Sequence, residues 1–377
     1  MTSNAVTNVN KPAAAKRKAG ASILKEWSVP IFFLVVSIIL VIAAKLDINY
    51  LINEIITRLG RNTFLVLSLL IPVMAGLGLN FGIVIGAMAG QTALVIVTHY
   101  RIGGISGFLL AALVSVPFAV LFGWLTAQVL NRAKGREMVT SMIMGFFANG
   151  LYQLVFLVLL GTLIPMKDTV LMLTSGVGLR NTVDLIAISN SLDRAFDPIW
   201  KGLIMADLGP APIGPWRIPV ATLLAVMAIC GVLAFLTRTK LGQQMRAVGQ
   251  DMHIAEVAGI NVDRTRVIAL VISTVLAAWG QLIFLQNMGS MNSFNSHEQV
   301  GMFSIAALLV GGATVRRATI WNAIIGVLLF HTLFVVSPLA GQRLLGAPQV
   351  GEYFRSFLAY GVIAVALALH AWQSKGK

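Results

Sequence analysis

Long apolar runs separated by short polar segments dominate the chain. Besides a continuous stretch at 62–98, the runs lie at about 28–44, 105–130, 138–161, 218–236, 267–285, 300–314, 320–337 and 354–372. Lipid offers the backbone no hydrogen-bond partner, so a crossing segment must satisfy its own polar groups, as a helix of about 20 residues does. The pattern therefore predicts an all-α integral membrane protein.

The stretch 62–98 is too long for a single crossing. As one helix it would be about 55 Å long, whereas the hydrocarbon core of a bilayer is about 30 Å thick. We expect it to break near Gly78–Gly82, either into two spans or into a span and a re-entrant piece. With two crossings in this stretch, the predicted count is about ten transmembrane helices.

The distribution of charge predicts the orientation. Only 11% of the residues are charged, and the net charge is +14. If the spans alternate from a cytoplasmic N-terminus, most Lys and Arg residues fall on the inner side, as the positive-inside rule requires. Both termini are therefore expected in the cytoplasm and the protein in the cell (inner) membrane. The same rule accounts for the basic excess, so nucleic acid is not a predicted partner.

Two terminal and loop regions complete the predicted organisation. Residues 1–27 are polar and basic and are expected to form a disordered cytoplasmic tail, followed by a polytopic membrane domain over 28–377. The longest outer loop, 162–217, mixes charges with apolar residues such as Leu185 and Ile188. Loops this long are often functional, so we expect a partly ordered piece that could dock an external partner.

The polar stretch 237–266 lies between two apolar runs and predicts two short helices at the membrane surface. The first would run from about Leu241 to Val248, with Gly249 closing it in the left-handed conformation. Asp251 could cap the second helix. That helix would end near Ala258, where Gly259 and the apolar Ile260 fit a Schellman motif.

Four small or flexible apolar residues lie along this stretch: Met245, Val248, Met252 and Ala255. Such a surface could dock into a groove on another protein. The alternative is a solvated linker that only joins two spans. Two successive capped helices are unusual in an ordinary connection, which favours docking.

The sequence of this stretch resembles a known family. Residues 241–250 (LGQQMRAVGQ) and 255–260 (AEVAGI) are similar to the cytoplasmic coupling loop of bacterial ABC importer permeases of the ribose/galactose type, whose relatives include nucleoside importers. The run 306–314 (AALLVGGAT) is similar to the Gly-Gly turn between two late spans of that family. The resemblance covers the chain from about Phe64 to the C-terminus.

The resemblance implies partners and coupling residues. In that family the loop docks on cytoplasmic ATP-binding subunits, an extracytoplasmic binding protein delivers the solute, and a second permease subunit, identical or paralogous, completes the path. The residues that match the coupling loop are Arg246, Ala247, Gly249, Glu256 and Gly259. The chain departs from the family where 79–81 (LNF) replaces Asp-Leu-Ser and where 315–317 (VRR) replaces glycine-rich sequence.

A regular series of glycines occurs in the stretch 62–98. Gly78, Gly82, Gly86 and Gly90 recur at intervals of four. On one helix they would form a smooth ridge that lets another helix approach closely. The ridge could serve helix packing alone, or it could line a path beside the neighbouring amides.

The spans hold amides and hydroxyls rather than charges, and we expect no Asp, Glu, Lys or Arg deep in any of them. Intramembrane amides are costly unless they are paired, so they are candidates for a solute path, although interhelical hydrogen bonds are their commoner use. Neutral amides suit a neutral polyhydroxylated or nucleoside-like solute. The five candidates are Asn80, Gln91, Asn149, Gln153 and Gln281.

The sequence contains no motif that would let the chain hydrolyse ATP itself. It has no phosphate-binding loop of the form Gly-x-x-x-x-Gly-Lys-Ser/Thr, and no catalytic or metal-binding spacing of its five His residues or of the single Cys230. We therefore predict no enzyme, no metal and no cofactor, with energy supplied by separate ATPase subunits. A stand-alone secondary carrier or facilitator remains the alternative, and a membrane scaffold without transport is a second one.

Overall fold

The computed structural model describes residues 11–166, 171–174, 176–196 and 218–375. Almost all of the described elements are helices. They are α1 (Lys11–Ala44), α2 (Ile48–Ser68), α3 (Leu70–Met74), α4 (Ile83–His99), α5 (Gly104–Arg132), α6 (Glu137–Leu154), the π-helical turn η1 (Val155–Leu159), α8 (Val220–Arg238), α9 (Lys240–Gln250), α10 (Met252–Val257), α11 (Val262–Met288), α12 (Ser296–Val310), α13 (Ile320–Leu345) and α14 (Pro348–Lys375).

The all-α membrane architecture is confirmed. Within the described residues, seven helical segments are long and apolar enough to cross a bilayer: those that contain α1, α2 with α3, α5, α6 with η1, α8, α11 and α13. The apolar helix α4 has 17 residues and α12 has 15, and neither of these nor α14 is among the seven. The count of ten and the cytoplasmic position of both termini stay predictions.

Different elements lie at the two ends of the bundle. Helix α11 follows α10 at Val262 and leads into the strand β2 (Ser290–Asn292) after Met288. We call the end with α9 and α10 the inner end and the end with β2 the outer end. At the outer end β2 pairs antiparallel with β1 (Thr182–Asp184), so the strand β1 fixes the described residues 176–196 of the loop after η1 to the bundle. The later part of the expected loop 162–217 lies outside the described residues.

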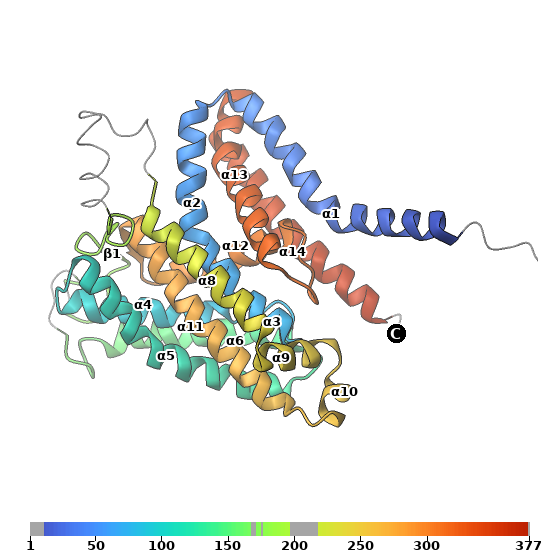
Figure 1. Cartoon of the computed structure of the whole chain (residues 1–377). Coiled ribbons are helices and arrows are strands. Elements are labelled where there is room, and N and C mark those ends of the chain that lie inside the picture. Colours follow the sequence, from blue (N-terminus) through green and yellow to red (C-terminus); the bar gives the residue numbers. More distant parts are fainter. Residues whose placement is uncertain (1–10, 167–170, 175, 197–217, 376–377) are drawn as a thin grey trace, which may run out of the picture.

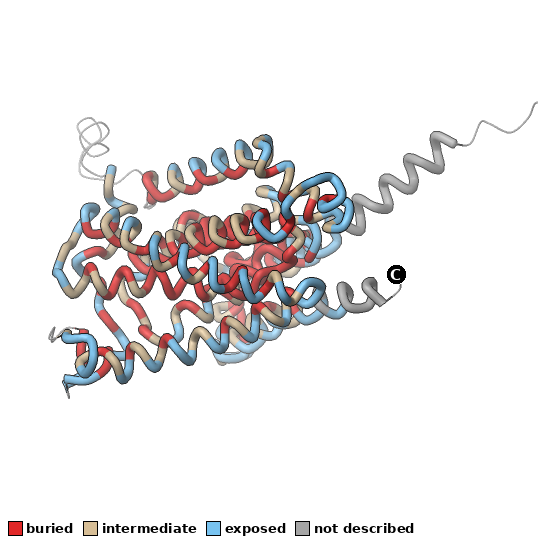
Figure 2. The backbone as a smooth tube through the Cα atoms, turned by 90° about the horizontal axis from the view of Figure 1, so that it is seen from below, coloured by how far each residue is buried: buried red, intermediate tan, exposed pale blue. Residues whose placement is uncertain are grey.

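Helix α11 lies at the centre of the bundle. It packs against α2, α4 and α5, and about three fifths of its apolar window is buried. The outer helices α1, α5, α6 and α8 bury much smaller fractions, and Figure 2 shows the buried stretches in the middle of the molecule with exposed stretches around them. The exposed parts of α5 and α8 are apolar, as lipid contact requires.

The stretch expected to cross twice does break, but its first helix begins earlier than predicted. Helix α2 starts at Ile48, where Asp47 caps it by accepting from the N–H of Asn49, and not at residue 62. Its first turns alternate polar and apolar residues, which hides them from a search for apolar runs. Between α3 and α4 the chain is non-helical from residue 75 to 82, near the predicted break.

The N-terminal region also differs from its prediction. Residues 1–27 were expected to be a disordered tail. In the structure α1 begins at Lys11 and ends at Ala44, and Figure 1 shows its N-terminal part extending away from the other helices while the rest lies beside α13. The Ala- and Lys-rich composition of this segment has a high helix propensity, which the compositional argument for disorder does not weigh. Residues 1–10 lie outside the described residues.

Candidate functional site: a surface helix pair and a polar cluster between the spans

The polar stretch 237–266 forms the two expected helices. Helix α9 starts at Lys240, after the Thr239 side chain accepts a hydrogen bond from the N–H of Gly242 at 3.3 Å. It runs to Gln250, two residues beyond the predicted end. Gly249 is therefore inside the helix and does not close it with a left-handed residue, as the sequence analysis expected. Asp251 ends α9 instead, because its backbone is extended.

Gly249 has a different reason to be glycine. The side of α9 that carries it lies against the non-helical segment after α3, and a Cβ on Gly249 would overlap the carbonyl oxygen of Met74. A Cβ on Gly76 would lie 2.9 Å from the Cα of Gly249, and Gly76 has a φ of +75°. The two backbones therefore meet without side chains between them, so a movement of α9 acts directly on the start of the α3–α4 connection.

The second helix is capped as predicted. Asp251 accepts from the N–H groups of His253 and Ile254 at 2.8 and 3.0 Å. After α10, Gly259 has a φ of +80°, and the N–H of Ile260 donates to the carbonyl of Ala255 at 3.0 Å, which completes the Schellman motif. The backbone of this six-residue helix is thus held at both ends.

The apolar residues predicted to form a docking surface on α9 and α10 face the interior of the chain instead. Met245, Val248 and Ala255 are buried within the chain, and the last two pack with Val262. Side chains that fill the chain's own interior cannot be offered to a groove on another protein. The outward surface of α10 instead presents Ile254 and Val257, which are 67% and 78% exposed.

The five residues assigned by resemblance take different positions. Arg246 and Glu256 are exposed, and the guanidinium of Arg246 donates to the carbonyl of Thr237, which joins α9 to the end of α8. Ala247 is half-buried and packs on the small apolar cluster beneath the pair. Gly259 is exposed and serves the turn. The structure thus brings all five onto one surface element.

A buried ion pair lies beneath the helix pair, where α6 and α11 begin. The side chain of Arg266 in α11 is fully buried, and its Nη2 lies 2.7 Å from Oε1 of Glu137, the first residue of α6. Nη1 also contacts the sulfur of Met252 in α10 at 3.3 Å, and Nη2 approaches the carbonyl of Leu130 in α5 at 3.4 Å. One guanidinium thus joins α5, α6, α10 and α11.

Other charges also lie on membrane helices. Glu54, Arg58 and Arg61 belong to α2, where Arg58 pairs with Glu54 at 2.7 Å. The apolar pattern begins only at residue 62, so it predicts a position outside the membrane for these residues. Glu298 belongs to the first turn of α12.

The four glycines of the predicted ridge do not lie on one helix. Gly86 and Gly90 lie on α4 and face α11, where added Cβ atoms would approach the carbonyl oxygens of Thr274 and Ala278 at 2.7 and 2.6 Å. Gly78 is not on the helix and has a φ of +70°. Gly82 immediately precedes the helix. The interval of four therefore reflects one packing face only over its second half.

The non-helical segment before α4 is a junction of the inner end. A Cβ on Gly78 would contact Met138 of α6 and Val315 of the α12–α13 turn, each at 3.2 Å. The side chain of Asn80 is turned back on its own segment and accepts from the N–H of Gly82 at 2.9 Å. Asn80 therefore stabilises the turn, and the described contacts do not bring it to the other pathway candidates.

Three of the five pathway candidates do come together, around a histidine whose position in the sequence shows no catalytic or metal-binding spacing. The ring of His297 in α12 lies between Gln91 of α4 and Asn149 of α6, with Nδ1 at 2.8 Å from one amide oxygen and Nε2 at 2.9 Å from the other. Gln153 donates to Asn149 at 3.4 Å. Tyr152 donates to Gln91 at 3.2 Å.

Glu298 completes this polar cluster, which consists of Gln91, Asn149, Tyr152, Gln153, His297 and Glu298. The amide nitrogen of Asn149 donates to Oε1 of Glu298. Gln281, the fifth pathway candidate, is not among its contacts: it is fully buried in α11, and neither atom of its amide has a partner among the described residues. Tyr152, His297 and Glu298 could not be found from the sequence, because only the fold places α12 beside α4 and α6.

The cluster lies in the middle of the bundle. Gln91 is at the centre of α4, and Asn149 is near the centre of the span formed by α6 and η1. His297 and Glu298 are in the first turn of α12, so this helix begins at the depth of the cluster and runs from there towards the inner end. Discontinuous helices that start between other spans are typical of solute sites in transporters.

The outer end holds a second polar network, around Asp193. One carboxylate oxygen accepts from Gln286 at 2.9 Å and from Thr222, and the other accepts from Asn287 at 2.7 Å. Arg61 donates to Asn287 at 3.0 Å. These bonds join the ordered loop to α2, α8 and α11, so the network fixes the loop to the bundle.

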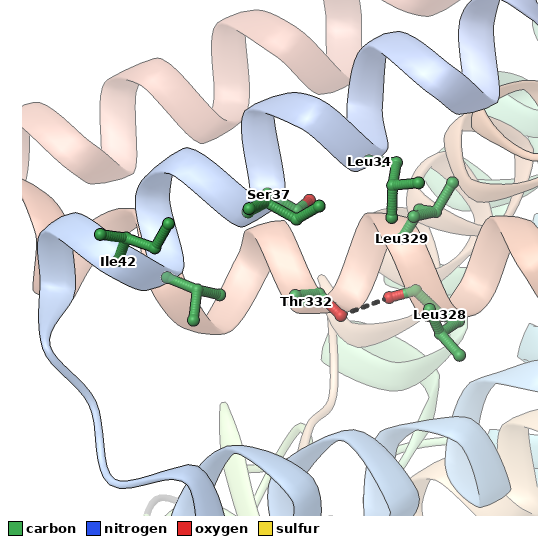
Figure 3. Close-up of a pocket in the computed structure, with 8 residues that line it drawn as sticks. Leu34, Ser37, Ile42, Leu328, Leu329 and Thr332 are labelled. Carbon is green, nitrogen blue, oxygen red and sulfur yellow. Dashed lines mark hydrogen bonds between the residues drawn. The ribbon is translucent and has the colours of Figure 1, made fainter.

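The cavity shown in Figure 3 is not a convincing solute site. It lies between α1 and α13, where Leu34, Ser37 and Ile42 face Leu328, Leu329 and Thr332 (Figure 3). Its volume of about 180 Å³ is below the range of roughly 300–1,000 Å³ usual for small-molecule pockets. The hydroxyl of Thr332 is already bonded to the carbonyl of Leu328. Among the described residues, no group of three or more His, Cys, Asp or Glu side chains could hold a metal ion.

Comparison with known proteins agrees with this architecture. The sequence model of the family described as "Branched-chain amino acid transport system / permease component" matches residues 51–367. A xylose transport system permease protein of Haemophilus influenzae is 31% identical over 34% of this chain and 33% of its own. A nucleoside ABC transporter permease protein of Lactococcus lactis is 29% identical over 31% of this chain and 30% of its own.

A third relative aligns over a longer segment. A galactose/methyl galactoside import permease protein of Salmonella typhimurium is 25% identical over 48% of this chain and 49% of its own. The alignments therefore span about a third to a half of the length of these relatives. No solved structure matches the chain significantly.

Proposed function

The chain belongs to the family of branched-chain amino acid transport system permease components, and from that premise we propose that it is the membrane-spanning permease subunit of an ABC importer. Two cytoplasmic ATP-binding subunits would drive transport, an extracytoplasmic binding protein would deliver the solute, and a second permease subunit would complete the path. The chain itself is a multi-pass membrane protein and not an enzyme. The family favours this function over the stand-alone carrier.

The observation that carries the proposal is the outward surface of α10. Ile254 and Val257 are large, apolar and mostly exposed on a helix whose backbone is fixed at both ends. Exposed apolar side chains at a polar inner surface are unfavourable in water, and a protein partner that covers them removes this cost. Exposed Arg246 and Glu256 nearby offer charge-assisted contacts at the rim of the same surface.

Two contacts would transmit movement from this surface to the spans. Gly249 touches the connection between α3 and α4 through backbone alone. Arg266 joins α10 to the first residue of α6 through Met252 and Glu137. Helices α4 and α6 carry Gln91 and Asn149 of the polar cluster. A shift of the helix pair would therefore reach both sides of the cluster.

We infer that the solute is small, polar and neutral. The names of the three relatives refer to xylose, nucleosides and galactose, all of which are rich in hydroxyl groups. The polar cluster presents amides and a carboxylate, which suit hydroxyl groups as donors and acceptors. A simple sugar or a nucleoside fits these groups better than an anion does.

The proposal is tested by co-purification of the tagged chain with its ATP-binding subunit from detergent extract. Ile254→Asp combined with Val257→Asp should abolish recovery of the ATPase subunit, because two charges would be buried in the contact. Ile186→Asp is the matched control, since Ile186 is 80% exposed but lies next to β1 at the outer end. It should leave recovery unchanged.

Two results would contradict the proposal. Equal recovery of the ATPase subunit with the double variant and the control would show that α10 is not the contact. Uptake of radiolabelled xylose or uridine by vesicles that contain this chain alone would restore the stand-alone carrier as the better explanation.

A further inference from the structure

One side of the polar cluster is not closed by the protein. Asn149, Gln153 and Glu298 are only half-buried, and Gln299, the next residue on α12 after Glu298, is exposed. We call these four residues the α6–α12 polar face. Because Asn149 lies near the centre of its span and Glu298 in the first turn of a helix that begins at the same depth, the face lies in the middle of the membrane layer.

Lipid is an unsuitable neighbour for this face. A carboxylate and three amides that face hydrocarbon would lose their hydration with too few partners to replace it. Elsewhere the exposed mid-membrane positions are apolar, as Val120 and Leu121 on α5 and Met227 on α8 show. The α6–α12 polar face is therefore turned towards something polar, either a water-filled path or a second protein surface.

The contacts behind the face hold Glu298 in place. Asn149 gives its amide N–H to Oε1 of Glu298 and turns its own oxygen to Nε2 of His297. The fully buried ring of His297 is held on its other side by Gln91, and its edge lies against the ring of Tyr152, with centroids 5.1 Å apart. Among the described residues the hydrogen bonds to Glu298 engage only Oε1. Within the described part of the chain Oε2 makes no hydrogen bond, so it can accept one from a ligand.

The cluster also contains an unused donor. The amide nitrogen Nε2 of Gln91 has no hydrogen-bond partner among the described residues, although the side chain is fully buried. An unpartnered buried amide is unfavourable. This donor is available to a solute or to a water molecule that enters the cluster.

We propose that the α6–α12 polar face is a solute site halfway along the path, facing the second permease subunit, for a neutral hydroxylated molecule. Oε2 of Glu298 accepts hydrogen bonds from solute hydroxyls, while the amides of Gln153 and Gln299 both donate and accept. No cationic side chain belongs to the face, so the carboxylate repels phosphorylated sugars and other anions. This inference rests on the proposed function as a permease.

Cysteine accessibility tests the location of the site. The chain has one native cysteine, so Cys230→Ser removes every thiol from this chain, and labelling is read on this chain alone. In the assembled importer complex, Gln153→Cys and Gln299→Cys should react with a charged, membrane-impermeant thiosulfonate at least about ten times faster than Val120→Cys. Val120 is the control at matched depth, because the adjacent Ala119 packs with Ala89 and Ala278 next to the level of Gln91.

Solute protection tests the ligand class in the same complex. Xylose or uridine should slow the reaction at Gln299→Cys, and ribose 5-phosphate should not. Equal reaction rates at Gln299→Cys and Val120→Cys would overturn the proposal. So would labelling of the free permease that disappears completely on assembly, since the face would then be an interface and not a path.

A transport measurement separates this proposal from the proposed function. Glu298→Gln keeps the size of the side chain and removes its charge, so uptake of xylose or uridine should fall about tenfold while the ATPase subunit is still recovered. Asp263→Asn removes a carboxylate from the exposed pair with Lys134 and is the control. Unchanged uptake with Glu298→Gln would refute the solute site. Failure of the unaltered chain to recover the ATPase subunit would instead refute the permease function.

Discussion

The inner end and the middle of the bundle use polar and small residues in opposite ways. At the inner end, Arg266 and Glu137 form an ion pair that is almost completely buried. The backbone of Gly249 also packs directly against the backbone of Gly76. In the middle, the groups are amides, an imidazole and one carboxylate, and half of them are partly exposed. This difference indicates that the contacts at the inner end hold the helices in one arrangement. In the middle, polar groups remain available to form hydrogen bonds with a solute.

The largest expected effect comes from removing the backbone contact at the inner end. Gly249→Val places a branched side chain where even a Cβ would overlap the carbonyl of Met74, so α9 must move away from the α3–α4 connection. Transport should fall at least about tenfold, because this contact passes movement to α4. Uptake in vesicles with the complete importer measures it.

The matched control is Gly231→Val on α8, where an added Cβ meets no atom within 4 Å. It should retain most of the uptake. If Gly249→Val assembles with the ATPase subunit and transports at the normal rate, the backbone contact has no role in coupling.

The next effect concerns the buried pair. Glu137→Gln leaves the guanidinium of Arg266 buried without a counter-charge, which typically costs about 3–5 kcal/mol in proteins. We expect a clearly lower unfolding temperature in detergent and a lower ratio of solute transported to ATP hydrolysed. Thermal unfolding and paired uptake and ATPase assays measure the two quantities.

The exposed pair of Lys134 and Asp263 is the comparison for this change. Both partners are about half exposed, so Asp263→Asn should cost no more than about 1 kcal/mol. Equal unfolding temperatures for the two variants would show that burial does not distinguish the pairs. Exchange of the two residues, Arg266→Glu with Glu137→Arg, should recover part of the lost stability.

A smaller effect is expected in the middle of the bundle. His297→Gln removes the ring that joins Gln91 to Asn149 but keeps a polar side chain, so the net loss is that of one or two neutral hydrogen bonds. Uptake should fall several-fold, with a change in unfolding free energy of about 1–2 kcal/mol. The two measurements are made on the same preparation. A large loss of stability with normal uptake would assign the ring to helix packing alone.

The smallest effect concerns the cap between the two surface helices. Asp251→Ala removes the acceptor for the N–H groups of His253 and Ile254 and should destabilise α10 by about 1 kcal/mol. Hydrogen exchange of the α10 amides measures the loss. Asp251→Asn keeps an acceptor and should restore most of the protection. Equal exchange in both variants would show that the cap is not what orders the helix.

Much of the fold could be predicted from the apolar pattern, and its errors have physical causes. The break between α3 and α4 followed from bilayer thickness, because no apolar helix of that length fits the layer. The start of α2 at Ile48 was missed because Glu54, Arg58 and Arg61 interrupt its hydropathy. Their charges are compensated by an ion pair and by contacts with other helices, which the sequence does not show.

The candidate site was predicted only in part. Gln91, Asn149 and Gln153 were candidates because amides in apolar spans need partners, and the structure brings them together. Asn80 belonged to the same class and turned out to stabilise its own turn. His297 and Glu298 lie just before the apolar run that begins at residue 300, so the apolar pattern does not mark them. Side-chain type alone could not separate these cases, since the difference lies in which helix stands opposite.

The sequence by itself determined the membrane class, the positions of most spans and the caps of α10. Helix caps depend on interactions between residues a few positions apart, and spans depend on the length of apolar runs relative to the bilayer. Both can be read from the local sequence. Only the tertiary structure decided that Gly249 meets Gly76, that Arg266 reaches Glu137 and that His297 joins Gln91 to Asn149. These contacts join residues far apart in the chain, and their geometry is set by how whole helices pack, which no local pattern specifies.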